Sequence, residues 1–308
     1  MTSLEPQAVS QQNRGADARY YSENGYVVCS NLIPHGFIDR LLESYEKEIR
    51  PSNHPFYRQS SGKYEVNKRN EHGYVVQSFL DIHDYEKFKA FSERSLDLFT
   101  CPRLLSKLSE ITGAQSFNLM QTMLFDANTA TQPHQDWWYL DTVPNGHLIA
   151  AWIAMEDIDE RAGRFYVLRD TTQVDLHSDT PNLPHLTWIR RVEEYLRGHP
   201  EKVVAPALKK GDVLFWNSRT IHGALPTQDP SFSRKSLTAH YIPSTMKFGN
   251  LFKVKDYIEY KEFRGVKFFK NQPDYTFWNH LKSEFKLKAY NSPRLLKFLR
   301  RFQGVLAK

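Results

Sequence analysis

Residues 132–138 read Gln-Pro-His-Gln-Asp-Trp-Trp, and a second isolated histidine, His222, follows much later in Thr220-Ile-His-Gly-Ala224. On a β-strand, His134 and Asp136 would project from the same side while Gln135 points away, because side chains alternate. Two imidazoles and one carboxylate form a facial ligand set that suits non-haem Fe(II) and leaves the opposite face of an octahedron open. Since His222 lies 86 positions after Asp136, such a site requires a fold that brings distant strands together.

Segments with the length and pattern of β-strands surround these residues. They span residues 116–125, 147–155, 164–168, 213–216 and 234–242. Turn signals separate them, and no helix alternates with strands across 116–170, which argues against a parallel βαβ sheet. We therefore predict a mainly β protein with flanking helices, built on a double-stranded β-helix core, that is, a cupin-like antiparallel jelly roll.

The His-x-Asp spacing alone does not establish a metal site, because it occurs by chance in chains of this length. A strand-end histidine that hydrogen-bonds to a nearby aspartate is the alternative. Four longer motifs favour the metal site: Met120-Gln-Thr-Met-Leu-Phe125, His134-Gln-Asp-Trp-Trp-Tyr139, Ile149-Ala-Ala-Trp-Ile-Ala-Met-Glu-Asp-Ile158 and Gly211-Asp-Val-Leu-Phe-Trp-Asn-Ser-Arg-Thr-Ile-His222. In combination they resemble the phytanoyl-CoA dioxygenase family of Fe(II)- and 2-oxoglutarate-dependent oxygenases, over roughly residues 18–243.

The resemblance implies that His134, Asp136 and His222 are both the metal ligands and the catalytic centre. Arg234, twelve residues after His222, matches the arginine that pairs with the far carboxylate of 2-oxoglutarate. A planar guanidinium can hold a carboxylate through two parallel hydrogen bonds, which a lysine cannot do. Many relatives place this arginine about one residue earlier, so Lys235 is the competing candidate.

Further contacts to 2-oxoglutarate are implied at three positions. Ser236 lies two residues after Arg234 and could add a hydroxyl on the same side of the strand. Gln121 and Trp152 match family positions that line the cosubstrate region, and core packing is the alternative for both.

Substrate contacts are harder to assign, because the chain departs from the family after residue 168. Many relatives carry a Pro-Gly-Ser-His type of turn there, whereas this chain has Val167-Leu-Arg-Asp-Thr-Thr172. Arg164 and Tyr166 precede that turn and are candidate substrate residues, with solvent-facing positions as the alternative for the arginine. Strand alternation would also send Trp138 to the metal face as a pocket wall, unless it packs in the core.

The resemblance implies an oxidoreductase: a 2-oxoglutarate-dependent dioxygenase that hydroxylates an aliphatic C–H bond of a small-molecule metabolite and releases succinate and CO2. The implied cofactors are Fe(II), the cosubstrate 2-oxoglutarate and O2. Related halogenases carry glycine or alanine at the position of Asp136, so the carboxylate favours hydroxylation over chlorination. Desaturation, ring formation and epimerisation stay open.

Two alternatives also stay open. One is a non-catalytic metal-binding or regulatory protein on the same scaffold that acts through its basic C-terminal tail. The other is a cupin-like metalloenzyme, such as a thiol or ring-cleaving dioxygenase. Neither has a physical need for the whole triad together with Arg234.

The chain of 308 residues divides into three parts in this interpretation. Residues 1–14 are expected to be disordered. Residues 15–246 form the dioxygenase domain, with helices at 35–49 and 102–112 and a lid-like insertion at 172–203 that contains a helix near 186–197. Residues 247–308 form a basic, partly helical extension packed on the same domain.

Charge and composition limit the partners. The extension holds 15 Lys and Arg against 5 Asp and Glu. It includes a predicted helix at 292–302, which could dock on the core or contact an acidic carrier protein, a membrane surface or a dimer partner. No nucleic-acid-binding motif accompanies the charge, and no apolar run is long enough for a transmembrane segment. The two cysteines, Cys29 and Cys101, are far apart, and we expect a cytoplasmic protein.

Overall fold

The computed structural model describes residues 15–180, 182–255 and 257–290. Its largest element is an eight-stranded sheet whose main path runs β1-β10-β7-β12-β5-β15-β14, with β4 paired to β5. These strands are β1 Tyr26–Cys29, β4 Phe79–Leu80, β5 Phe117–Phe125, β7 Ile149–Ala154, β10 Val213–Asn217, β12 Ser236–Pro243, β14 Lys261–Phe263 and β15 Val266–Phe268. The pairing is antiparallel except between β15 and β5.

Smaller sheets complete the double-stranded β-helix. One is β11-β8-β9 and another is β13-β6, with a separate β2-β3 hairpin. Their strands are β2 Phe56–Arg58, β3 Lys63–Glu65, β6 Asp141–Val143, β8 Phe165–Leu168, β9 Val203–Val204, β11 His222–Ala224 and β13 Lys247–Gly249. The predicted jelly-roll core with flanking helices is confirmed.

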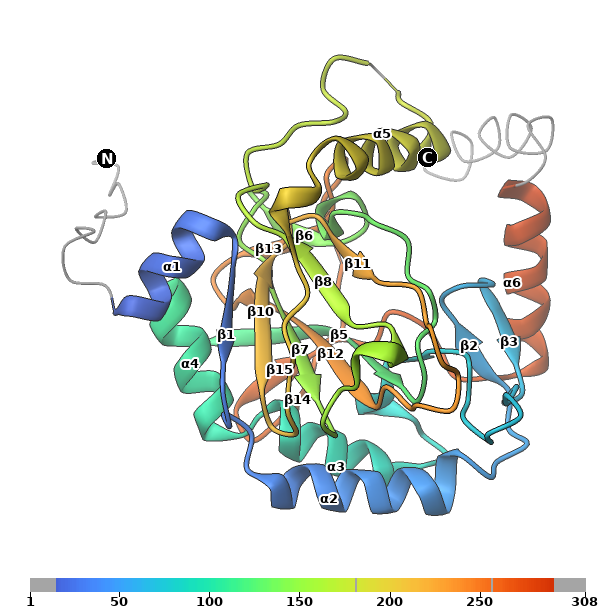
Figure 1. Ribbon diagram of the computed structural model, residues 1–308. Helices are drawn as coiled ribbons and strands as arrows, with labels where there is room; N and C mark the ends of the chain where they lie inside the picture. Colours follow the sequence, from blue (N-terminus) through green and yellow to red (C-terminus); the bar gives the residue numbers. More distant parts are fainter. Residues whose placement is uncertain (1–14, 181, 256, 291–308) are drawn as a thin grey trace, which may run out of the picture.

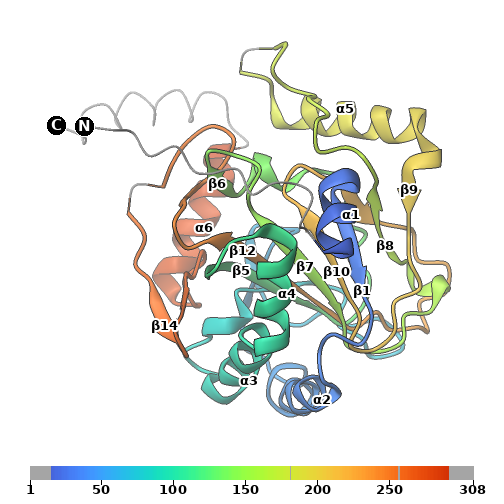
Figure 2. The ribbon, with the colours of Figure 1, turned by 90° about the vertical axis from the view of Figure 1, so that its left-hand side faces the viewer.

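Helices cover one face of the large sheet, as Figure 2 shows for α4 in front of β5, β12 and β7. The helices are α1 Ala16–Asn24, α2 His35–Ser44, α3 Lys89–Phe99, α4 Pro102–Thr112, α5 His185–Gly198 and α6 Phe277–Tyr290. A π-helical turn, Tyr45–Ile49, extends α2, so the predicted helix over 35–49 is present. Gly113 ends α4 with a left-handed backbone at φ 80°, as expected for a helix C-cap.

Strand alternation assigns the two faces of the large sheet. On β12, Leu237, Ala239 and Tyr241 join the apolar core under the helices. The intervening residues Thr238 and His240 therefore face the interior between the sheets, where both line a cavity. The same alternation on β7 places Ile153 under the helices and Trp152 in the interior.

One element around the motif differs from the prediction. Residues 134–136 do not form a regular strand: His134 makes a single bridge to His222, and Asp136 begins a 3₁₀ turn that ends at Trp138. Gln135 is still extended, with φ −115° and ψ 134°, so its neighbours project from the same side. Its own side chain points away and donates hydrogen bonds to the carbonyls of Val174 and Arg219.

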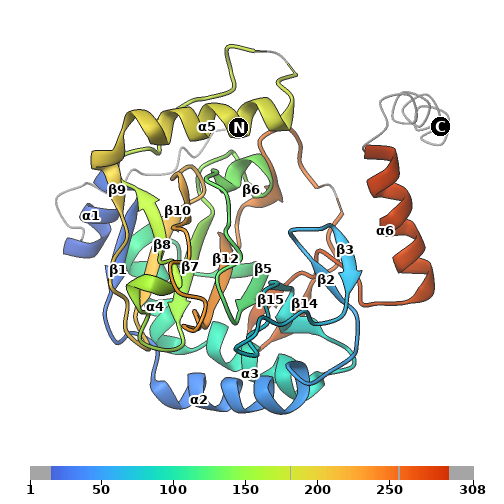
Figure 3. The ribbon, with the colours of Figure 1, turned by 45° about the vertical axis from the view of Figure 1, so that its right-hand side comes forward.

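Two helices lie outside the sheet–helix core. Figure 1 shows α5, in the 172–203 insertion, across one end of the sheets. Figure 3 shows α6 standing beside the β2-β3 hairpin, where Glu284 pairs with Lys63 at 3.0 Å. In the part of the chain that the structure describes, no helix combines the length and apolar character needed to cross a membrane.

The C-terminal extension contributes strands as well as a helix. β15 pairs with β5 in the large sheet, and β13 pairs with β6. Residues after 246 therefore add strands to the β-structure formed by the residues before them. The predictions for residues 1–14 and for the helix at 292–302 lie outside the described residues.

Candidate active site

The three predicted metal ligands converge. The backbones of His134 and His222 exchange two hydrogen bonds of 3.0 Å, N–H to carbonyl in each direction, which brings their rings to one place. Oδ1 of Asp136 lies 3.6 Å from Nε2 of His134 and 3.5 Å from Nε2 of His222. One potential ligand atom from each residue lies within 4.8 Å of the other two. The sequence separation is thus closed by a β-bridge between the segment at His134 and the first residue of β11.

Hydrogen bonds fix which imidazole nitrogen faces the centre. Nδ1 of His134 is 2.8 Å from the Gln132 carbonyl, and Nδ1 of His222 is 2.9 Å from the Thr220 carbonyl. A carbonyl can only accept, so each Nδ1 carries the proton and each Nε2 is left as a lone-pair donor. Burial lowers the pKa of His222 to about 4, which keeps it neutral and able to bind a cation.

The carboxylate of Asp136 is held at its other oxygen. Oδ2 accepts a hydrogen bond of 2.9 Å from the indole Nε1 of Trp216 and lies 3.4 Å from Nε2 of His240. Burial alone would raise the pKa of Asp136, but the histidines around it, His222 first, outweigh burial and hold that pKa well below its usual range. Asp136 is therefore an anion that presents Oδ1 to the two imidazoles.

This donor set fits an octahedral ferrous ion. Neighbouring ligands at metal distances of about 2.1 Å and right angles are roughly 3 Å apart, close to the spacings between Asp136 and the two histidines. Two neutral nitrogen donors and one carboxylate are the facial set expected for non-haem Fe(II). A metal bound here would face a cavity of about 700 Å³.

Arg234 lies two residues before β12 and lines the same cavity. It is 2 % exposed, its Nη1 donates a 3.0 Å hydrogen bond to the Gly163 carbonyl, and its Nε has no partner. Burial lowers the pKa of the guanidinium to about 10, so it stays charged at neutral pH. No acidic side chain among the described residues forms an ion pair with it. A buried cation of this kind is stable only with an anionic partner, and the carboxylate of a bound cosubstrate can be that partner.

Lys235, the competing candidate, points elsewhere. Its Nζ lies 3.4 Å from Glu156 and 3.9 Å from Asp126, so carboxylates already neutralise it. Arg234 and Lys235, which both precede β12, thus contact different groups. The geometry therefore favours Arg234 over Lys235 as the residue that pairs with the cosubstrate carboxylate.

The other predicted cosubstrate residues divide into two groups. Gln121 and Trp152 line the cavity. Ser236 does not line it; its hydroxyl donates to the Arg234 carbonyl at 3.3 Å. Ser236 is thus placed to support the backbone beside the arginine rather than to contact a ligand.

The three predicted substrate residues are not among those that line the cavity. Trp138 stacks on Trp188 of α5, with ring centroids 4.4 Å apart. Its expected direction was wrong because the 3₁₀ turn at Asp136 ends the strand alternation. On β8, Phe165 lines the cavity, so Arg164 and Tyr166 on either side face away, and the prediction was off by one position.

Sequence reasoning missed three residues that contact or face the centre: Trp216, His240 and Phe165. Trp216 was part of a quoted motif without a role. His240 could have been found, since it lies two residues after Thr238 on β12, and both side chains line the cavity. Alternation along β12 was the available signal.

Known proteins resemble this chain in sequence and in fold. The family model described as phytanoyl-CoA dioxygenase (PhyH) matches residues 21–236. The peroxisomal phytanoyl-CoA dioxygenase of Homo sapiens is 27% identical over 239 residues, which cover 72% of this chain and 66% of the human protein. That of Bos taurus is 26% identical over 247 residues, covering 75% of this chain and 68% of the bovine one. The chain thus spans about two thirds of the length of these curated relatives.

Solved structures share the fold at lower identity. EctD from S. alaskensis with 2-oxoglutarate and 5-hydroxyectoine aligns with a TM-score of 0.59 at 15% identity, covering 89% of this chain and 90% of EctD. The epimerase SnoN from nogalamycin biosynthesis, in complex with Fe3+, alpha ketoglutarate and nogalamycin RO, aligns with a TM-score of 0.55 at 18% identity, covering 83% and 95%. Both of these neighbours hold 2-oxoglutarate on this jelly roll.

Proposed function

This chain belongs to the phytanoyl-CoA dioxygenase family of Fe(II)- and 2-oxoglutarate-dependent oxygenases, and on that premise we propose that it hydroxylates an aliphatic C–H bond of a small-molecule metabolite. The match covers residues 21–236, more than half of the chain. We propose His134, Asp136 and His222 as the iron ligands, and Arg234 with Gln121 and Trp152 as the cosubstrate site.

One observation supports the proposal above all others: a buried arginine, which has no acidic partner among the described residues, shares a cavity with the metal triad. A metal-binding protein without catalysis needs the triad but has no use for an unpaired guanidinium beside it. A cosubstrate with two carboxylates explains both features, because one end can chelate the metal while the other pairs with Arg234.

In this proposal, the chain's own residues bind and orient the metal, the cosubstrate and the substrate. Bound Fe(II) and 2-oxoglutarate, with O2, supply the oxidant that removes hydrogen from the substrate and release succinate and CO2. Trp216 and His240 hold Asp136 so that Oδ1 faces the imidazoles. Phe165 and Trp152, stacked with ring centroids 5.7 Å apart, form an apolar wall of the cavity that limits access of water.

The lining of the cavity indicates the substrate's chemistry. Asp136 and Arg234 are the only Asp, Glu, Lys or Arg among the described lining residues. Neutral hydrogen-bonding side chains line much of the rest: Tyr57, Gln59, Ser60, Thr129, Gln132 and Gln272. We propose that the part of the substrate inside the cavity is uncharged, because no free counter-charge is left to receive an ion.

The insertion at 172–203 supplies part of the cavity wall. His185 and Ile189 of α5 line the cavity, and Nε2 of His185 lies 2.6 Å from the Tyr139 hydroxyl. These contacts support the lid-like role predicted for this insertion. We propose that α5 covers the substrate.

A spectroscopic titration tests the function. Fe(II) and 2-oxoglutarate added anaerobically to the protein are expected to give a weak visible charge-transfer band, since the keto acid would chelate the metal. When air and a substrate that the protein oxidises are then added, one succinate should form for each 2-oxoglutarate consumed. Folded protein that binds iron but gives no such band would support the alternative, a metal-binding or regulatory protein on the same scaffold.

We also propose a reducing compartment such as the cytoplasm. Cys29 and Cys101 are buried and unpaired, and oxidising compartments favour disulfides over free thiols. Fractionation of cells that express the tagged chain tests this location.

A further inference from the structure

A second cavity, of about 550 Å³, lies where β5 begins, between the turn after β12 and the β14-β15 hairpin. Three lysines line it: Lys247, Lys255 and Lys267; we call it the lysine pocket. Within the described chain it shares no lining residue with the active-site cavity. It is therefore a separate place for a ligand.

The three lysines of the pocket are solvent-exposed and form no ion pair with another described residue. In residues 15–180, 182–255 and 257–290, no carboxylate lies within ion-pair distance of the three ammonium groups, whereas two other lysines of the same segment are paired. Lys261 lies 2.8 Å from Asp84, and Lys270 lies 2.8 Å from Asp274. Among the lysines of this segment that have no ion pair with a described residue, three thus lie together around one cavity.

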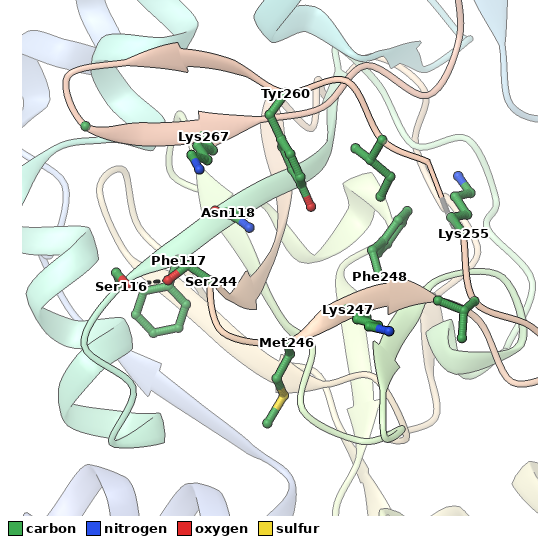
Figure 4. Close-up of a pocket in the computed structure, with 13 residues that line it drawn as sticks. Ser116, Phe117, Asn118, Ser244, Met246, Lys247, Phe248, Lys255, Tyr260 and Lys267 are labelled. Carbon is green, nitrogen blue, oxygen red and sulfur yellow. Dashed lines mark hydrogen bonds between the residues drawn. The ribbon is translucent and has the colours of Figure 1, made fainter.

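The pocket is shaped as well as charged. Figure 4 shows Lys267 and Asn118 on one side and Lys255, Lys247 and Phe248 on the other, with the Tyr260 ring between them. Asn118 is only 5 % exposed, because its strand lies between β12 and β15. Its amide is a fixed polar group at the floor of the cavity.

Aromatic rings fix the position of one lysine. The Lys255 ammonium lies 4.8 Å from the centroid of Phe248 and 5.0 Å from that of Phe269, and Nζ is 3.2 Å from Oδ1 of Asn271. A lysine held over two ring faces loses less freedom on binding an anion than a free surface lysine does. Phe248, Met246 and Ile258 add apolar surface to the pocket.

We propose that the lysine pocket binds a phosphorylated organic molecule of about nucleotide size. The three ammonium groups match the charge of one or two phosphates. A cavity of 550 Å³ is too large for an inorganic anion and lies within the range of small-molecule sites. The apolar side chains of the pocket contact the organic part of this ligand.

The bound molecule does not compete with the cosubstrate. Asn271, which contacts Lys255, donates its backbone N–H to Asp81 at 2.8 Å, and so does Gln272 at 2.9 Å. Gln272 lines the active-site cavity. The Asn271–Gln272 segment, anchored on buried Asp81, thus lies beside both cavities. Because the two cavities share no lining residue, both can be filled at the same time.

Calorimetric titration of the full-length protein with ADP, with adenosine as the uncharged control, tests the proposal. ADP is expected to bind at least about tenfold more tightly than adenosine, with an affinity that saturating 2-oxoglutarate leaves unchanged. Equal binding of ADP and adenosine, or displacement of ADP by 2-oxoglutarate, overturns the proposal.

Matched lysine variants locate the site. Lys255→Gln and Lys267→Gln should each weaken ADP binding about fivefold or more, since each removes a charge-assisted contact to phosphate. Lys253→Gln and Lys261→Gln remove charges that do not line the pocket and should change the affinity less than about twofold. Equal losses in all four variants would mean non-specific attraction to a basic surface and would also overturn the proposal.

Discussion

The indole Nε1 of Trp216 donates a 2.9 Å hydrogen bond to Oδ2 of Asp136, the oxygen that does not face the two imidazoles. Trp216 lies on β10 and is 1 % exposed, so its ring cannot turn without disturbing the interior. The contact fixes the carboxylate before any metal binds. Preorganisation of this kind raises metal affinity, because the ligand loses no further freedom.

Trp216→Phe should therefore weaken Fe(II) binding about 10- to 100-fold, the range typical for loss of a hydrogen bond to a metal ligand. Equilibrium dialysis under anaerobic conditions measures this. Trp188→Phe is the matched control, because the buried indole N–H of Trp188 has no acceptor in the part of the chain that the structure describes. If both variants bind iron like the parent protein, the indole contact does not position Asp136.

His240→Phe should weaken Fe(II) binding less than Trp216→Phe, by about three- to tenfold. Its Nε2 lies at 3.4 Å from Oδ2 of Asp136, a longer contact than that of Trp216. Because both side chains act on one oxygen, the double variant should lose less affinity than the two single losses combined. Strict additivity in the same dialysis experiment would show that the two residues act independently.

Arg234→Ala should raise the 2-oxoglutarate concentration needed for half-maximal charge-transfer absorbance about tenfold or more. The variant loses a paired, charge-assisted contact to a carboxylate, and each such loss of about 1.4 kcal/mol is a factor of ten. Iron content should stay the same. Lys235→Ala is the control, since Lys235 faces Glu156 and Asp126; an equal effect there would place the cosubstrate on the other face of the strand.

Gly163→Ala should lower the free energy of unfolding by about 1–3 kcal/mol. Gly163 has φ +81°, and an added Cβ would lie 2.2 Å from Nδ2 of Asn128 and 2.6 Å from the Leu225 carbonyl. Because the Gly163 carbonyl accepts from Arg234, 2-oxoglutarate affinity should fall too. Denaturant titration measures the stability.

Gly198→Ala is the matched control for that substitution. Gly198 is the last residue of α5, and no atom lies within 4 Å of an added Cβ. Alanine has the higher helix propensity, so stability should be unchanged or slightly higher. A loss equal to that of Gly163→Ala would point to a general effect of removing glycine.

Much of the β-core could be predicted from the sequence, because each strand is encoded by a pattern of neighbouring residues. Strands were predicted at residues 116–125 and 234–242, and the structure has β5 at Phe117–Phe125 and β12 at Ser236–Pro243. The triad was also predictable, since few side-chain types can bind iron and the resemblance selected these three. Hydrophobic periodicity and ligand chemistry are properties of short segments.

Other predictions failed where alternation was assumed beyond the end of a strand. Asp136 begins a 3₁₀ turn, so Trp138 packs on α5 instead of lining the cavity. At β8 the prediction placed Arg164 and Tyr166 on the cavity side of the strand, whereas the structure places Phe165 there. A shift of one residue reverses the face of every side chain in a strand, and the sequence alone does not fix that register.

The amino-acid sequence determined the ligand types, the strand pattern and the arginine that follows the distal histidine, because each depends on residues near one another in the chain. Tertiary structure alone decided that Trp216 and His240 hold the second oxygen of Asp136 and that three lysines surround a separate cavity. Those contacts join residues far apart in the chain, and which of them form depends on how the sheets close and pair in three dimensions.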